Sequence, residues 1–213
     1  MQNAPQTLED IIKTRRSIRH FSKEIPSDEL VNKIVTTAIY APFGWATNIP
    51  FDEMRKIFIL KQGTEKMNLA KKLLLAMIKK SSKWLHIITK ILPFLKKKMG
   101  NFIKLLDNIN QRGIPGLETA PYYIIIAEKK WFPPVEKQSI AHAMQNMWLM
   151  TTHLWLWFQL LTATSMMSKN KEFMEILWLA KWGYTIDGCL VGYATTYPEE
   201  VKQFEIEKFI TWL

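Results

Sequence analysis

Two stretches near the amino end of the chain carry apolar residues at helical spacing. The first runs over 7–14, where Thr7 can accept a hydrogen bond from the first helical turn and two acidic residues follow it. The second begins at Ser27 and carries apolar residues three and four positions apart until a Pro-Phe-Gly sequence at 42–44 ends it. We therefore expect two helices, joined by a loop over 15–26.

Three short apolar runs, at 55–60, 122–127 and 188–195, are strand candidates. Each is rich in β-branched or aromatic residues, which suits a sheet that is covered on both faces. Helical segments separate the three runs, so the expected fold class is α+β or α/β. No internal repeat and no linker interrupts the chain, and we expect 1–213 to form a single domain.

A charge-free stretch covers residues 139–168, which contain no Lys, Arg, Asp or Glu. A membrane span needs about 20 predominantly apolar residues. Polar side chains, among them His142 and Gln159, interrupt this stretch. The expected structure is one long helix buried in a globular or dimer core, and a membrane span is the alternative.

The positive charge of the chain is concentrated in one segment. Ten lysines and no acidic residue lie between Lys71 and Lys104, whereas the rest of the chain has 19 basic and 19 acidic residues. The formal net charge of +10 therefore belongs to a local insert, and it does not indicate a nucleic-acid-binding protein.

This lysine-rich insert, at about 64–112, alternates its lysines with apolar residues at roughly helical spacing. Pro93 is expected to break or kink the helix. One interpretation is a solvated pair of amphipathic helices that caps a dimer. The other is peripheral attachment of residues 71–104 to an anionic membrane surface, since basic amphipathic helices with Trp and Phe lie in that interface.

Other sites receive little support. The first ten residues are polar and predict no signal peptide, and the lone Cys189 cannot form an internal disulfide, so we expect a cytoplasmic protein. Cys189 itself is expected to be a buried, inert residue of a strand. The four histidines have no zinc-site spacing, and no Gly-x-Ser-x-Gly, Walker or Rossmann motif is present.

A cluster of arginines lies between the first two helices. Residues 15–19 read Arg-Arg-Ser-Ile-Arg, and three guanidinium groups with one hydroxyl can bind a phosphate and nearby carbonyl oxygens through charge-assisted hydrogen bonds. In an extended segment, Arg15, Ser17 and Arg19 would share one side, and Arg16 and Ile18 would share the other. A solvated basic turn is the alternative.

The sequence TRRSIRHFSKEIPSDELVNKIVTTAIYAP resembles the opening of the nitroreductase family. Members of this family typically have Arg-Arg-Ser-(Ile/Val)-Arg-x-Phe, then Ile/Val-Pro, then a helix that ends in Ala-Pro. The matching positions here are Arg15, Arg16, Ser17, Ile18, Arg19, Phe21, Ile25, Pro26, Ala41 and Pro42. In the family this first loop binds FMN, so the resemblance implies FMN contacts for Arg15, Arg16, Ser17 and Arg19.

The resemblance implies further contacts outside this loop. After Ala-Pro, the family has a loop that reaches the flavin of the partner subunit, and Asn48 is the corresponding residue, shifted by one position. A short segment beside the flavin N5 edge corresponds to Thr162, Ala163 and Thr164. A basic residue that binds the phosphate near the carboxyl end corresponds to Lys202, with Lys208 as the second choice.

The charge-free segment is similar to the long central helix of the family, which lies in the dimer core. The sequence departs from the family pattern at Trp155 and Trp157, because both stand where glycines are usual. Two indole groups need more space than close packing around two glycines would leave. The resemblance therefore implies either a reshaped flavin side or a different dimer packing.

The resemblance implies a nitroreductase-like α+β three-layer sandwich, with a mixed central sheet flanked by helices. It also implies an intertwined homodimer with two FMN molecules at the interface. NADH or NADPH would reduce FMN, and a nitroaromatic, a quinone or a related electron-poor small molecule would then accept the electrons in a ping-pong mechanism. No protein acid or base, no metal and no nucleic acid is assigned.

Two alternatives remain open from the sequence. The scaffold also serves dehalogenation and other flavin chemistry, so the acceptor need not be a nitro compound. The second alternative is a membrane-surface or partner-binding protein on the same scaffold, in which the Trp substitutions have closed the flavin site.

Overall fold

The computed structural model describes residues 7–44, 49–196 and 204–213. Its elements run along the chain in the following order: α1 (Leu8–Thr14), α2 (Asp28–Ile39), α3 (Phe51–Met54), β1 (Arg55–Lys61), α4 (Glu65–Ile91), α5 (Phe94–Arg112), β2 (Tyr122–Lys129), α6 (Glu136–His153), β3 (Trp157–Leu160), the 3₁₀ helix η1 (Thr162–Lys169), α7 (Lys171–Ile176), β4 (Tyr184–Gly192) and the 3₁₀ helix η2 (Ile206–Lys208).

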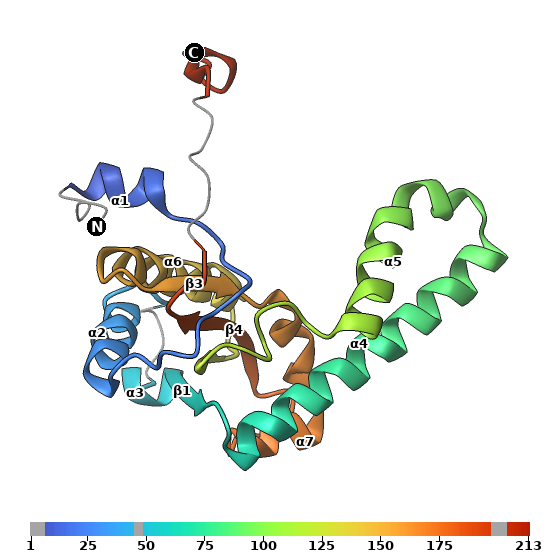
Figure 1. Ribbon diagram of the computed structural model, residues 1–213, viewed down its shortest axis with the longest axis horizontal. Helices are drawn as coiled ribbons and strands as arrows, with labels where there is room; N and C mark the ends of the chain where they lie inside the picture. The colour runs from blue at the N-terminus through green and yellow to red at the C-terminus, as the bar shows by residue number, and fades with distance from the viewer. Residues whose placement is uncertain (1–6, 45–48, 197–203) are drawn as a thin grey trace.

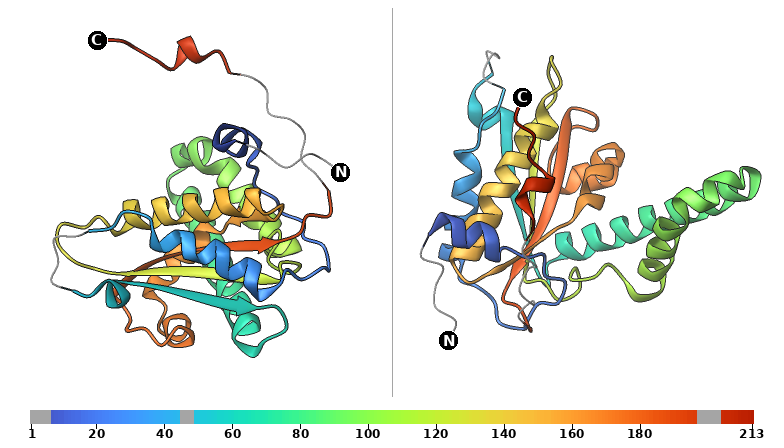
Figure 2. Two further views of the ribbon diagram at one scale, coloured as in Figure 1. Left: turned by 90° about the vertical axis from the view of Figure 1, so that its left-hand side faces the viewer. Right: turned by 90° about the horizontal axis from the view of Figure 1, so that it is seen from above.

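A four-stranded sheet with the order β1-β2-β4-β3 forms the middle layer (Figure 1). Helices α2 and α6 cover one face, and α4, η1 and α7 lie on the other (Figure 2, right). The expected α+β three-layer arrangement is confirmed. The expectation of a mixed sheet needs a correction, since all pairs among these four strands are antiparallel. In the described part of the chain, parallel pairing is confined to a bridge between Ser17 and Phe158.

Strand β2 shows why the sheet is buried on both faces. Successive side chains of a strand point to opposite faces. Tyr122 and Ile124 pack with α2 and α6, whereas Tyr123 and Ile125 pack with α4, η1 and α7. All four residues are at most 2% exposed, so this part of the strand must carry apolar side chains on both faces. Cys189 of β4 is buried as expected, and burial raises the pKa of its thiol.

The two amino-terminal helices begin as the sequence predicts. Thr7 accepts a hydrogen bond from the backbone N–H of Asp10, and the Asp10 carboxylate accepts one from the backbone N–H of Thr7. Ser27 accepts a hydrogen bond from the backbone N–H of Leu30. These caps satisfy backbone donors that a helix start would otherwise leave unpaired, and they fix both ends of the 15–26 loop.

The lysine-rich insert forms a helical hairpin that projects from the body of the molecule (Figure 1). Helix α4 ends at Ile91 and α5 begins after Pro93, so the expected break at this proline is confirmed. Between the two helices, Asp107 accepts hydrogen bonds from Ser82 (2.7 Å) and pairs with His86 (3.0 Å). We call α4 and α5 together the hairpin.

The expectation of a single long helix over 139–168 is wrong. Helix α6 ends at His153, and residues from Trp157 onward form strand β3, which pairs with β4. Trp155 lies in the turn between them with a φ of +59°. This left-handed conformation is easy for glycine and unfavourable for other residues. Trp155 therefore keeps a backbone conformation that glycine would adopt without strain.

A pair of substitutions separates this strain from the packing of the indole group. We expect Trp155→Gly to be more stable than Trp155→Ala by about 1 kcal/mol, because both variants lose the indole and only glycine relieves the left-handed conformation. Urea unfolding of the two variants measures the difference. An alanine variant as stable as the glycine variant would contradict the interpretation.

Among the described residues, no helix has both the length and the apolar character that crossing a membrane requires.

Candidate functional site

The arginine segment lies along the edge of the sheet. The backbone N–H of Ile18 donates to the carbonyl of Phe158 in β3 (3.1 Å), and that of Ser22 donates to the carbonyl of Tyr193 (2.8 Å), just beyond β4. Ile18 is buried and anchors the segment, whereas Arg19 is exposed. The loop between α1 and α2 is thus attached to two strands and presents its polar residues at one rim of the sandwich.

Aromatic side chains hold Arg15 in place. Its guanidinium carbon lies 4.1 Å from the centre of the Trp148 ring, on helix α6. Trp148 in turn stacks on Phe158, with 4.9 Å between ring centres and 17° between ring planes. The Nε of Arg15 is buried and has no hydrogen-bond partner among the described residues. A buried donor of a charged group without an acceptor is costly, so this arrangement suits an anionic or carbonyl ligand.

The other polar residues of the segment differ in availability. Arg16 folds back along the end of α1, where its Nη1 donates to the carbonyls of Lys13 and Arg15, both at 2.7 Å. Burial, and to a smaller extent the charge of Arg15, lowers the pKa of Arg16. Ser17 is half-buried beside Phe158. Arg15, Ser17 and Arg19 are therefore better placed than Arg16 to receive a ligand.

The segment 162–164 follows β3 at the start of η1. Thr162 is exposed and Ala163 is half-buried. Thr162 comes four residues after Phe158, so at most about 14 Å of extended chain separate it from the strand position that Ser17 joins. The fold thus connects the arginine segment and the start of η1 through one short strand.

Thr164 is part of the core. It is 0% exposed, its hydroxyl donates to the carbonyl of Leu161, and it accepts a hydrogen bond from the Tyr123 hydroxyl, both at 2.7 Å. Burial raises the pKa of Tyr123 far above the usual range. Core residues already occupy both hydrogen-bonding roles of the Thr164 hydroxyl, so the structure gives no support to the direct contact expected for Thr164.

A mainly apolar cleft of about 950 Å³ separates the hairpin from η1. Thr162, Ala163 and Met166 line one wall, and Trp84 and Phe102 of the hairpin line the other. Neither Trp155 nor Trp157 is among the described residues that line this cleft. Trp155 and Trp157 therefore do not close this cleft.

Two of the predicted ligand residues, Asn48 and Lys202, lie outside the described residues. Lys208, the second choice for the phosphate, is exposed and forms an ion pair with Glu205 at 2.5 Å. Its position adds no support to a role in phosphate binding.

Sequence reasoning missed a buried pair of charged groups at the opposite end of β2 from the strand residues that hold the arginine segment. Arg55, at the start of β1, forms a buried ion pair with Glu128 of β2 at 2.6 Å. It also donates to the carbonyls of Ala38, Ala41 and Pro42, where α2 ends. Burial raises the pKa of Glu128, although Arg55 and Ser139 oppose the shift. Arg55 thus holds the start of the loop that follows α2. Knowledge of the strand register, in which Arg55 faces Glu128, would have revealed the pair.

The sequence matches the model of the nitroreductase family over residues 12–193. The chain belongs to the nitroreductase family. No curated protein matches it.

Solved structures of nitroreductases share the fold. A nitroreductase from Bacteroides fragilis with bound FMN is 18% identical, with a TM-score of 0.72, 98% of this chain covered and 100% of the other. One from Desulfitobacterium hafniense, also with bound FMN, is 22% identical, with a TM-score of 0.69 and full coverage of both chains. A variant of an FMN- and NADPH-dependent nitroreductase from Sphingopyxis is 15% identical, with a TM-score of 0.66, 97% of this chain covered and 98% of the other. At these identities, the likeness shows the nitroreductase fold.

Proposed function

We propose that this nitroreductase is an FMN-dependent oxidoreductase that uses NADH or NADPH to reduce electron-poor small molecules such as nitroaromatics or quinones. The observation that carries the proposal is the buried, unpaired Nε of Arg15 in the segment that matches the FMN loop of the family. The bound FMN in two of the similar structures, and the NADPH dependence named for a third, support it.

The described residues fit this cofactor. Arg15 is held on Trp148 with an unused donor, and Arg19 and Ser17 add an exposed cation and a hydroxyl at the same rim. Arginine suits a phosphate, because its planar group donates two parallel hydrogen bonds. We propose that Arg15, Ser17 and Arg19 hold FMN directly. Arg16 would add its positive charge, and Thr162 and Ala163 would contact the ring edge.

FMN held by Arg15, Ser17 and Arg19 would supply the chemistry of hydride and electron transfer between a reduced nicotinamide and a small-molecule acceptor. The protein supplies binding and electrostatics. The Arg15 guanidinium would bind an anionic group with little reorganisation, since it is already immobilised on an indole. The cleft beside Thr162 and Ala163 is lined mainly by apolar side chains, which suits a flat aromatic acceptor.

We also propose that the active form is a homodimer, to which Asn48 would contribute from a loop of the partner subunit. The membership of the family supports this proposal. Size-exclusion chromatography with light scattering should give twice the mass of one 25.0 kDa chain.

The function is tested by the colour and the chemistry of the purified protein. We expect a yellow protein that releases FMN on heating and oxidises NADPH or NADH when a quinone or nitroaromatic is added. A panel that also contains halogenated phenols would separate nitro and quinone reduction from dehalogenation. A colourless protein that does not bind added FMN would contradict the proposal.

A further inference from the structure

The far end of the hairpin combines exposed apolar side chains with a cluster of lysines. We call residues 90–98, which join α4 to α5, the hairpin apex (Figure 1). Ile91, Leu92 and Phe94 are 71%, 42% and 72% exposed. The four lysines of the apex are also exposed, and they are Lys90, Lys96, Lys97 and Lys98.

The charge of the apex is not balanced locally. There is no acidic residue between Lys71 and Lys104. Among the described residues, the ion pairs of the hairpin involve Lys71 with Glu118 and His86 with Asp107, and none involves an apex lysine. The apex is therefore a cationic surface with apolar side chains at its centre.

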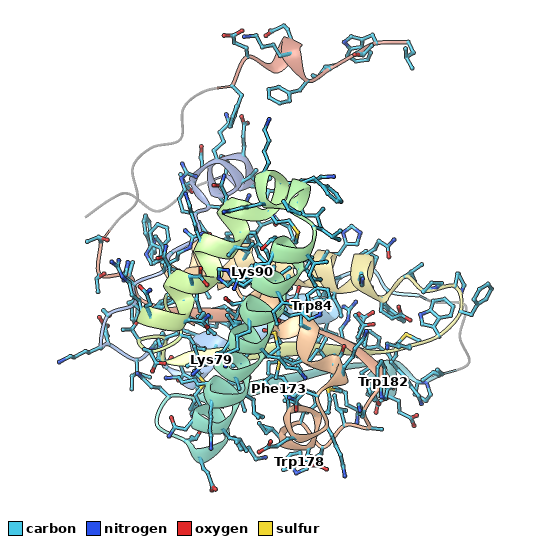
Figure 3. The ribbon with its side chains drawn as sticks, turned by 90° about the vertical axis from the view of Figure 1, so that its right-hand side faces the viewer. Lys79, Trp84, Lys90, Phe173, Trp178 and Trp182 are labelled. Atoms are coloured by element: carbon cyan, nitrogen blue, oxygen red, sulfur yellow. The ribbon has the colours of Figure 1, made fainter. Side chains whose placement is uncertain are left out.

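The apex is separate from the cleft beside η1. Figure 3 views the molecule from the side on which the hairpin projects, with Lys79 and Lys90 along α4. The hairpin residues that line the cleft, including Trp84, come from other turns of α4 and α5, and no residue of 90–98 is among them. A small ligand in the cleft would thus leave the apex exposed.

We propose that the hairpin apex binds to an anionic lipid surface. Ile91, Leu92 and Phe94 would enter the boundary between headgroups and acyl chains, and the four lysines would contact anionic headgroups. Basic, amphipathic segments with aromatic residues bind in this way, and each lysine near the surface adds to the attraction. Binding at the surface agrees with the finding that no described helix could cross a membrane.

The shape and composition of the apex favour lipid over other partners. Nucleic acid would pair with the lysines but leave the exposed apolar side chains in water. A second copy of the apex would bring like charges together, since all its charged residues are lysines. A lipid surface accepts a protruding apex, because it deforms around inserted side chains and carries negative charge.

The test is sedimentation of the full chain with vesicles of phosphatidylcholine alone or mixed equally with phosphatidylglycerol. We expect binding to the anionic vesicles only, and weaker binding as salt screens the lysines. Replacing the four apex lysines by glutamine should weaken binding by about fivefold for each lysine removed. Replacing Ile91, Leu92 and Phe94 by serine should abolish the binding that remains in high salt.

A matched control removes four exposed lysines elsewhere that form no ion pair with the described residues, with the same change in net charge: K23Q/K56Q/K130Q/K137Q. This control should bind almost as tightly as the wild type. Because the changed side chains are exposed, far-ultraviolet circular dichroism and melting curves should be unaltered in all variants. Equal binding of the apex and control variants, equal binding to both kinds of vesicle, or no binding to either would overturn the proposal. The assay needs no flavin, so its result is independent of the proposed enzyme activity.

Discussion

The Arg55→Met variant is expected to lose about 3–5 kcal/mol of the free energy of unfolding, because Glu128 would remain buried without its partner. For a chain of this size, that loss corresponds to a fall in Tm of roughly 6–20 °C. The variant would also lose the hydrogen bonds that Arg55 donates to the carbonyls of Ala38, Ala41 and Pro42. Thermal and urea unfolding beside the wild type measure the effect.

The pH dependence of this loss identifies its cause. Removing Arg55, whose charge lowers the pKa of Glu128, should raise that pKa further above its value in the unfolded chain. A group with a raised pKa in the folded state destabilises the protein as pH rises through that pKa. The loss in free energy of unfolding, relative to the wild type, should therefore be greatest near neutral pH. It should shrink as the pH falls toward the usual pKa of a carboxyl group.

The double variant Arg55→Met, Glu128→Met is the control, because it removes both charges and leaves no buried ion without a partner. It should recover much of the stability that the single variant loses. The account would be contradicted if Arg55→Met lowered the free energy of unfolding by less than about 1 kcal/mol, or if the loss did not change with pH. Either result would show that Arg55 does not stabilise the fold by compensating the charge of Glu128.

Replacing both Arg15 and Arg19 by alanine is expected to weaken FMN binding at least about a hundredfold. Each charge-assisted hydrogen bond contributes about 1.5–3 kcal/mol, and a factor of ten corresponds to about 1.4 kcal/mol. The substitution of Arg15 should account for the larger share, since Trp148 already holds this side chain and its Nε has no other acceptor. Titration of the flavin-free protein with FMN, followed by quenching of flavin fluorescence, gives the dissociation constants.

Arg16→Ala provides the comparison within the same segment. The Arg16 guanidinium already donates to the carbonyls of Lys13 and Arg15, so its replacement should weaken FMN binding by about tenfold or less. If Arg16→Ala weakened binding as much as Arg15→Ala, the difference inferred from the geometry of the two side chains would be wrong.

The sequence predicted most elements whose signals are local. The caps at Thr7 and Ser27, the strands at 55–60 and 122–127, and the break at Pro93 each depend on residues within one turn or one strand. The arginine segment was recognised in the same way, because its residues are consecutive. The structure attaches it to the edge of the sheet through Phe158.

The features that the sequence did not predict depend on contacts between distant segments. Strand β3 follows a helix within one apolar run, and only its pairing with β4 and the left-handed turn at Trp155 separate the two. Arg55 and Glu128 are 73 residues apart and meet through the strand register. Trp148 reads as one more apolar residue of a helix, but the fold places it under Arg15. Thr164 was assigned to the ligand, whereas packing against Tyr123 places it in the core.

The FMN content of the purified protein tests the central claim most directly. The absorbance near 450 nm, with protein measured separately, should give close to one FMN for each wild-type chain and almost none for the Arg15→Ala, Arg19→Ala variant, with both proteins folded by circular dichroism. A double variant that retains as much FMN as the wild type would contradict the claim that this arginine segment holds the cofactor.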